Sequence, residues 1–427
     1  MMQKNDPRYA AYVAVLKTHL RPAMGCTEPI AIAYASAIAR KALGCLPERV
    51  RVWVSGNIIK NAMAVTVPNT GGRKGIDAAC AAGIVAGDAS RELQVIAHVQ
   101  PEQLDAIDAY LQRKVISVDV KPDARLFDIL IEVEGDGHAA SARIADRHTN
   151  VVDVERDGQV MEHKTLTGET LSADENEALL TIEGIYDFAR SCDVADVQEV
   201  LQRQIDCNSA IAREGLTGRW GACVGKVLLD SYGASDVRVR AKAYAAAGSD
   251  ARMAGCEMPV IINSGSGNQG MTVSLPVIEY AKERGSTDEE LYRALVMANL
   301  AAIRCKALIG CLSAYCGAIS AGCAAGAGIA FLCGGDLHLI NHTIVNSLAI
   351  LSGTICDGAK PSCAAKIASA VDAALLGYHM ALADKEFRHG EGIVKKGVEN
   401  TIVSVGRLGK DGMKQTDEEI LRIMMNA

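Results

Sequence analysis

The feature that most constrains the fold is a run of 29 residues, 307–335, that carries no formal charge. Its length alone would allow a membrane-spanning helix, which needs about 20 apolar residues. Its composition argues against that assignment, because seven glycines and four cysteines dilute its apolar character and no second run of similar quality occurs. We therefore predict a helix buried in the protein core, where small residues let neighbouring backbones approach closely. No membrane association is expected.

Hydrophobic periodicity predicts a mainly helical chain that contains one strand-rich segment. Apolar residues recur at helical spacing over 7–20 and 28–43, and the chain after about residue 175 is typical of helices with short connections. Residues 49–55 alternate as a strand does. Four further strand-like stretches predict an antiparallel meander, at 115–120, 126–134, 138–146 and 151–156. A polar stretch, 163–177, closes this region.

The predicted fold class is α+β, mainly α. At roughly 150 residues per domain, a chain of 427 residues has room for two or three domains. We expect a large helical body formed by residues 1–45 and 165–427. A smaller antiparallel α+β domain, residues 46–164, would be inserted into it.

Composition narrows the classes of function. The formal net charge of −7 argues against nucleic-acid binding, which requires a basic surface to neutralise phosphates. The chain starts without an apolar run behind a positive segment, so no secretory signal is predicted. Fourteen cysteines without such a signal indicate the reducing cytoplasm, where disulfides are rare. Metal binding or catalysis is then a more plausible role for cysteines than disulfide formation. Most of these cysteines are nevertheless expected to pack as small buried hydrophobes.

A glycine-rich loop at 265–270 fits the pattern G-x-G-x-x-G between a short strand, 259–263, and a helix that starts at 271. A dinucleotide site is rejected, because no parallel strand ending in an acid follows. Backbone N–H groups at a helix N-terminus still suit a carboxylate. The predicted substrate contacts in this loop are Ser264, Gly265, Ser266 and Asn268. The alternative is a tight turn that merely requires glycine.

A second polar glycine loop, 68–75, precedes a predicted helix at 76–86. It is not a phosphate-binding P-loop, because no Lys-Ser/Thr pair follows the spaced glycines. Asn69, Thr70 and Gly71 offer an amide, a hydroxyl and a backbone N–H for a substrate. The alternative is a solvated turn.

The cysteine spacing excludes several metal and redox motifs, because no C-x-x-C occurs anywhere. The polar segment 356–363 is a predicted loop with a cysteine at each end, and a third thiolate could come from the uncharged helical segment. Three thiolates suit an iron–sulfur cluster in which one iron stays open for catalysis. From spacing alone, core packing remains the alternative.

Cys26 has a different setting, because it directly precedes a helix-start signature in which Thr27 is the predicted N-cap. A thiol at a helix N-terminus has a lowered pKa and is more readily a thiolate. Cys26 is therefore a candidate base, nucleophile or labile fourth cluster ligand. A structural loop cysteine is the alternative.

Four motifs together resemble the L-cysteine desulfidase family, which is related to the α-chain of iron–sulfur L-serine dehydratases. In chain order they are 24–29 (Met-Gly-Cys-Thr-Glu-Pro), 263–270 (Asn-Ser-Gly-Ser-Gly-Asn-Gln-Gly), 312–317 (Leu-Ser-Ala-Tyr-Cys-Gly) and 355–360 (Ile-Cys-Asp-Gly-Ala-Lys) with Cys363. The resemblance extends from about residue 8 to residue 408.

The resemblance implies an oxygen-sensitive [4Fe–4S] cluster in the helical body. The positions that match its three ligands are Cys316, Cys356 and Cys363, and Cys26 matches the catalytic cysteine. The implied reaction is an α,β-elimination without pyridoxal phosphate, which converts L-cysteine into sulfide, pyruvate and ammonia.

Alternatives remain open at this stage. L-Serine dehydratase would use the same cluster with hydroxide as the leaving group, and a non-catalytic iron–sulfur sensor would hold the cluster without turnover. Cys311 and Cys323 lie close to Cys316 in the sequence and are the alternatives to it as a ligand. The small-residue helices leave surface for a homodimer.

Overall fold

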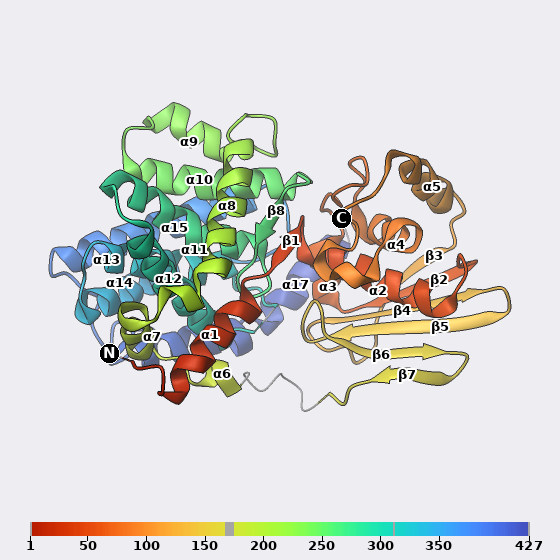
Figure 1. The fold of residues 1–427 in the computed structure, drawn as a ribbon, viewed down its shortest axis with the longest axis horizontal. Coiled ribbons are helices and arrows are strands. Elements are labelled where there is room, and N and C mark those ends of the chain that lie inside the picture. Colours follow the sequence, from red (N-terminus) through yellow and green to blue (C-terminus); the bar gives the residue numbers. More distant parts are fainter. Residues whose placement is uncertain (1, 167–174, 311, 426–427) are drawn as a thin grey trace.

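The computed structural model describes residues 2–166, 175–310 and 312–425, and it consists of two parts side by side (Figure 1). We call them the helical body and the sheet part. The helical body contains α1 (Pro7–His19), α6 (Glu175–Ala178), α7 (Ile182–Ser191), α8 (Gln198–Gly215), α9 (Val224–Tyr232), α10 (Val237–Met253), α11 (Gly267–Arg284), α12 (Asp288–Ala307), α13 (Gly317–Leu332), α14 (Leu337–Ile350), α15 (Cys363–Leu382) and α16 (Val398–Arg407). This arrangement confirms the predicted mainly helical α+β class.

Helix α13 lies at the centre of the helical body and packs against α11, α12, α14 and α15. Its glycines permit this packing: a Cβ atom added at Gly322 would lie 2.8 Å from the backbone of Ala370, and one at Gly328 would lie 2.8 Å from Ala298. The prediction of a buried helix is correct, but its extent over 307–335 is wrong. Helix α12 ends at Ala307 and α13 begins only at Gly317. Of the helices in the described residues, none combines the length and the apolarity needed to cross a membrane.

The sheet part is built on six strands in the order β3-β2-β4-β5-β6-β7. Its strands are β2 (Arg49–Val54), β3 (Ile116–Val120), β4 (Asp128–Gly135), β5 (His138–Ala145), β6 (Val151–Arg156) and β7 (Gln159–His163). Its helices are α2 (Thr27–Leu43), α3 (Gly56–Ala62), α4 (Gly75–Ala86) and α5 (Pro101–Gln112). Helix α2 packs on the sheet and α4 packs on α2. The predicted division into 1–45 with 165–427 and 46–164 stays a prediction.

Two features of the sheet differ from the predicted meander. Strand β3 pairs in parallel with β2, whereas antiparallel pairing was predicted for 115–120. The reason is the long crossover through α3, α4 and α5, which returns the chain in the same direction. Strand β7 lies just before the predicted polar stretch and overlaps it only at His163. It was missed because all its residues are exposed and lack an apolar alternation. Residues 167–174 of that stretch lie outside the described residues.

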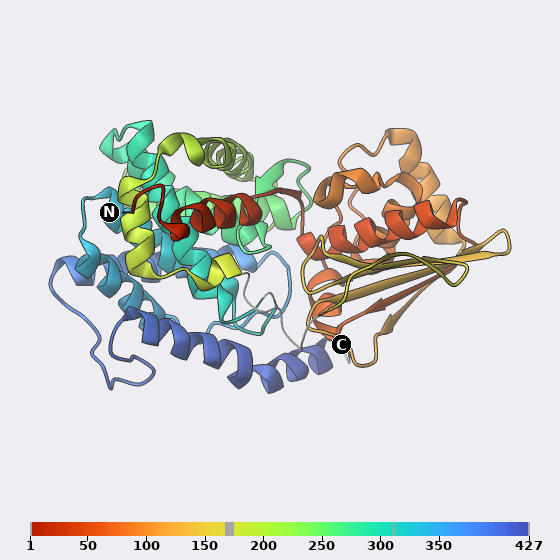
Figure 2. The same cartoon turned by 60° about the horizontal axis from the view of Figure 1, so that its bottom comes forward.

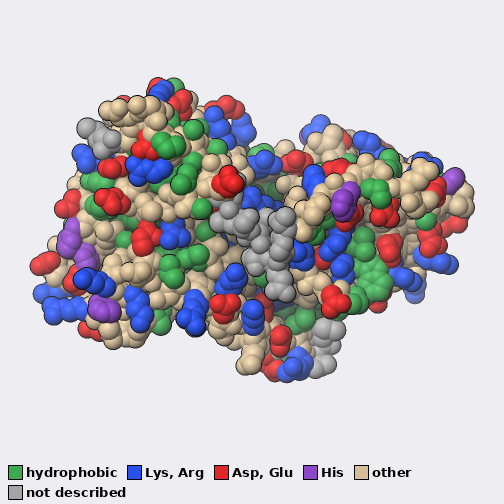
Figure 3. Space-filling model, turned by 90° about the horizontal axis from the view of Figure 1, so that it is seen from below, with side chains coloured by type: hydrophobic (Ala, Val, Ile, Leu, Met, Phe, Trp, Pro, Cys, Tyr) green, Lys and Arg blue, Asp and Glu red, His purple; other side chains and the backbone are tan. Residues whose placement is uncertain are grey.

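Two of the connections between the parts, among the described residues, are a strand pair and the C-terminal helix. Strand β1 (Pro22–Met24) of the chain entering α2 pairs antiparallel with β8 (Pro259–Ile261) of the helical body. The C-terminal helix α17 (Lys414–Met425) runs along the bottom from the helical body to the sheet part (Figure 2). It is held there by an ion pair between Asp417 and the buried Lys60 of α3. On the face seen in Figure 3, acidic and basic side chains are interspersed over both parts instead of forming a basic stripe.

Candidate active site

A cavity of about 100 Å³ is lined by residues of both parts. The four cysteines that the motifs identified all contribute to its lining. Cys26 lies at the start of α2, Cys316 at the start of α13, Cys356 in the loop that precedes α15, and Cys363 at the first position of α15. All four are free thiols. Segments that are hundreds of residues apart in the chain therefore meet at one place.

The position of Cys26 depends on the glycine before it. Gly25 has φ +59°, and a Cβ atom there would lie 2.7 Å from the ring of Pro68, so only glycine allows this turn between β1 and α2. Cys26 itself is the N-cap residue, and α2 begins at Thr27, one residue earlier than the predicted N-cap at Thr27 implied. The thiol is buried in a small apolar cluster that includes Val65.

The electrostatic setting of Cys26 is opposite to the predicted one. Its Sγ donates a hydrogen bond to Glu28 Oε2 at 3.1 Å, and Asn61 Nδ2 donates to Glu28 Oε1 at 3.3 Å. Burial, followed by the charge of Glu28, raises the pKa of the Cys26 thiol well above its usual range, while the positive charge of Arg252 acts in the lowering direction. The expected lowering of this pKa by the helix N-terminus is therefore wrong.

Backbone pairing brings Cys316 and Cys356 together. The N–H of Cys356 donates to the carbonyl of Ala314 at 2.6 Å, and the N–H of Cys316 donates to the carbonyl of Thr354 at 3.1 Å. Cys363 begins α15, and its Sγ lies 3.7 Å from the carbonyl oxygen of Gly358. The three thiols thus lie on adjacent walls of the cavity.

The chemistry of this donor set fits an iron–sulfur cluster. Burial and the negative charge of Cys356 raise the pKa of the Cys316 thiol to about 12, which shows that neighbouring thiolates would repel each other without a cation between them. Within the described ranges, no three His, Cys, Asp or Glu side chains converge on a site for a single metal ion. Cluster ligands bind separate irons, so they need to surround a space instead of converging on a point. Cys323, an alternative ligand, is buried on α13 outside this cavity, and Cys311 lies outside the described residues.

The predicted glycine loop at 264–268 also lines the cavity. Ser264, Gly265, Ser266 and Asn268 all contribute to its wall. Helix α11 begins at Gly267, four residues before the predicted start, so its first N–H groups point to this end of the loop. The antiparallel pairing of β8 with β1 agrees with the rejection of a dinucleotide fold, which requires parallel strands.

The other predicted loop lies outside the cavity lining. Asn69 Nδ2 donates to the carbonyl of Ile96 at 2.9 Å, and the buried Thr70 Oγ1 donates to the carbonyl of Val67 at 2.7 Å. Gly71 has φ +67° and serves the turn. These groups shape a loop whose Pro68 supports the turn before Cys26.

Sequence reasoning missed several cavity residues, among them Arg252, His148 and Lys306. His148 is buried in the turn after β5, and its ring packs edge-on against Phe127 at a centroid distance of 4.6 Å. Burial lowers the pKa of His148, and its Nε2 has no hydrogen-bond partner in the part of the chain that is described. No local pattern marks these residues, because Arg252 and Lys306 lie in the last turns of ordinary helices and His148 follows an ordinary strand.

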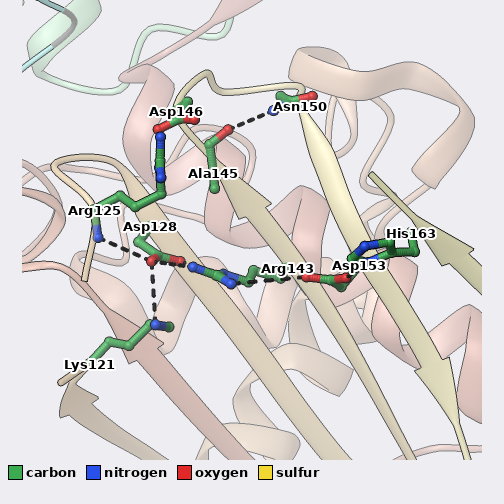
Figure 4. Close-up of polar contacts among 9 residues, drawn as sticks. All are labelled: Lys121, Arg125, Asp128, Arg143, Ala145, Asp146, Asn150, Asp153 and His163. Atoms are coloured by element: carbon green, nitrogen blue, oxygen red, sulfur yellow. Dashed lines mark hydrogen bonds and ion pairs between the residues drawn. The ribbon is translucent and has the colours of Figure 1, made fainter. Parts of the chain in front are cut away.

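Ion pairs on the sheet hold the turn that carries His148 (Figure 4). Arg125 Nε donates to Asp146 Oδ1 at 2.6 Å, two residues before His148. Arg143 makes a two-point contact with the buried Asp128 at 2.8 and 2.9 Å. Such paired, buried charges fix the backbone around them.

The comparisons with known proteins identify the family of the chain. Residues 90–422 match the family model described as serine dehydratase alpha chain. A UPF0597 protein of Desulfitobacterium hafniense (strain Y51) is 54% identical over 425 residues, which cover 100% of this chain and 99% of the relative. UPF0597 proteins of Lachnoclostridium phytofermentans and Finegoldia magna are 48% and 47% identical, and they cover 98% and 97% of this chain and 100% and 99% of their own lengths. These matches confirm the resemblance that the four motifs indicated, and the chain belongs to the serine dehydratase alpha chain family.

Proposed function

We propose that this protein is an L-cysteine desulfidase, which cleaves L-cysteine into sulfide, pyruvate and ammonia without pyridoxal phosphate. The observation that carries the proposal is the presence of Cys26, Cys316, Cys356 and Cys363 around one cavity. A dehydratase relationship supports a lyase reaction of this type, because dehydration and sulfide loss are both eliminations from an amino acid.

Cys316, Cys356 and Cys363 would hold a [4Fe–4S] cluster, which leaves one iron without a protein ligand. When bound, such a cluster supplies a Lewis acid that stabilises the departing sulfur. The loop at 264–268 would orient the substrate carboxylate before the reaction, because backbone N–H groups at the start of α11 face it.

Cys26 would remove the Cα proton of the substrate as a thiolate. The Cys26–Glu28 hydrogen bond gives the thiol proton an acceptor, so Glu28 would take this proton before Cys26 acts as the base. The electron pair of the Cα–H bond then forms the Cα=Cβ bond while the Cβ–S bond breaks and sulfide leaves. The resulting 2-aminoacrylate tautomerises, and one water molecule hydrolyses it to pyruvate and ammonia.

L-Serine dehydratase is the second candidate, and membership of the serine dehydratase alpha chain family favours it. Serine would lose hydroxide in place of sulfide, and the same residues would hold the cluster and take the proton. The ratio of kcat/KM for L-cysteine and L-serine distinguishes the two activities.

The test begins with anaerobic purification, followed by iron and inorganic sulfide analysis and by sulfide and pyruvate assays on both amino acids. Cys26→Ser should abolish turnover while cluster absorbance persists. Cys192→Ser, which changes a buried free cysteine outside the cavity, is the matched control and should keep both. Stoichiometric zinc without inorganic sulfide would contradict the proposal that the protein holds an iron–sulfur cluster. Turnover that survives in Cys26→Ser would remove Cys26 from the role of base, and a cluster without any turnover would indicate the sensor function.

A further inference from the structure

Arg252 has unused hydrogen-bonding capacity inside the cavity. It lies near the end of α10 and is only 2% exposed. Its Nη1 donates to Asn268 Oδ1 at 3.1 Å, but its Nε and Nη2 are buried and have no partner in the described part of the chain. A buried guanidinium whose donors are unpaired is costly, so its retention needs an acceptor that arrives from outside.

The acidic side chains of the fold do not supply that acceptor. Among the described residues, Glu28 is the one acid that lines the cavity, and its carboxylate accepts hydrogen bonds from Cys26, Thr27 and Asn61. The unpaired Nε–H and Nη2–H lie on the same edge of the guanidinium plane. This edge matches the two oxygens of a carboxylate in a two-point contact.

Gly267 places this edge beside a second anion-binding feature. A Cβ atom at Gly267 would lie 2.4 Å from Arg252 Nε and 2.9 Å from its Cζ, so the guanidinium is in close contact with the first residue of α11. The first N–H groups of a helix lack partners within it and attract negative charge. An arginine edge and a helix N-terminus thus favour an anion at the same place.

We propose that Arg252 binds the α-carboxylate of the substrate through Nε and Nη2 and thereby restricts the site to ligands that carry a free α-carboxylate. The identification of the ligand as an amino acid rests on the proposed function, whereas carboxylate binding by Arg252 does not. Arg252 is a specificity-determining residue in this scheme, and Asn268 positions it through the bond to Nη1.

The test uses two ligands that lack a leaving group, so that binding is measured without turnover. L-Alanine and L-alaninamide differ only in the carboxylate, and isothermal titration of the anaerobically purified full chain gives the Kd of each. The natural chain should bind L-alanine at least about 30-fold more tightly than L-alaninamide. In Arg252→Gln the Kd of L-alanine should rise about 30-fold while that of L-alaninamide stays within a few-fold, so the two become alike.

Two further variants separate geometry from charge. Arg252→Lys keeps the charge but not the two-point edge, and its discrimination should fall between those of the natural chain and Arg252→Gln. Lys306→Gln changes another buried cation of the same cavity and should keep the full discrimination. The proposed role of Arg252 would be overturned if Lys306→Gln lost as much discrimination between the two ligands as Arg252→Gln. It would also be overturned if Arg252→Gln or Arg252→Lys kept the full discrimination. Intact discrimination in a chain that turns over neither L-cysteine nor L-serine would refute the proposed function and leave the role of Arg252 standing.

Discussion

Replacing Asn299 by leucine should destabilise the fold at the loop that lines the cavity. Asn299 Oδ1 accepts hydrogen bonds from Gln204 Nε2 and Asn263 Nδ2, each at 3.0 Å. Its Nδ2 donates to Gln204 Oε1 at 2.8 Å and to the carbonyl of Leu295 at 2.9 Å. The three amide side chains are fully buried, and Asn263 directly precedes the 264–268 loop.

The magnitude follows from the groups that would lose their partners. In Asn299→Leu, both polar atoms of the Gln204 amide are left unpaired, while Asn263 Nδ2 keeps its 3.2 Å bond to the backbone oxygen at position 299. A buried unsatisfied polar group costs about 1–3 kcal/mol, so two groups cost about 2–6 kcal/mol. Replacing both partners by apolar residues, in Gln204→Met/Asn299→Leu, removes the unpaired groups. The double variant should therefore be more stable than the sum of the single effects predicts, by about 2 kcal/mol or more.

Urea unfolding of the four proteins in this cycle gives the free energies of unfolding. Asn400→Leu, at an exposed position of α16, is the matched control and should change stability by less than about 0.5 kcal/mol. A cost below about 1 kcal/mol for Asn299→Leu would refute the reasoning. Strict additivity in the double variant would refute it equally, because the argument depends on shared partners.

Three other outcomes are expected. Gly270→Ala should cost about 1–3 kcal/mol in urea unfolding, because its Cβ would lie 2.0 Å from a backbone oxygen of β8, whereas Gly353→Ala meets nothing within 4 Å and should be neutral. Burial raises the pKa of Asp250 from 3.8 to about 6, so the folded state binds more protons than the unfolded state across that window and stability should fall as pH rises through it. Asp250→Asn should remove about 3 kcal/mol of that pH dependence, and an unchanged pH profile would contradict the assignment. Lys60→Ala removes the buried partner of Asp417, so α17 should become accessible to limited proteolysis, and an unchanged cleavage pattern would argue against this ion pair as its main attachment.

The parts of the fold that were predictable are those with a strong local signal. Helical periodicity identified the helices at both ends of the chain, and alternation identified β4, β5 and β6. Strand β3 has the same local alternation, but its parallel partner β2 is fixed by the long crossover between them, which alternation does not encode. The uncharged segment predicted burial, but its division at Gly317 depends on backbone pairing with the chain before Cys356.

The sequence by itself determined the class of fold, the family and the four cysteines, because each of these depends on local pattern or on motifs in a fixed order. Only the tertiary structure decided that those cysteines surround one cavity and that Pro68, next to Asn69–Gly71, supports the turn before Cys26. It also decided that Arg252 lines the same cavity with two guanidinium nitrogens that are unpaired within the described part of the chain. The pKa of Cys26 shows the physical reason. The helix N-terminus is a local effect that a sequence reveals, whereas burial and the charge of Glu28 depend on what packs around the thiol, and these two effects are larger.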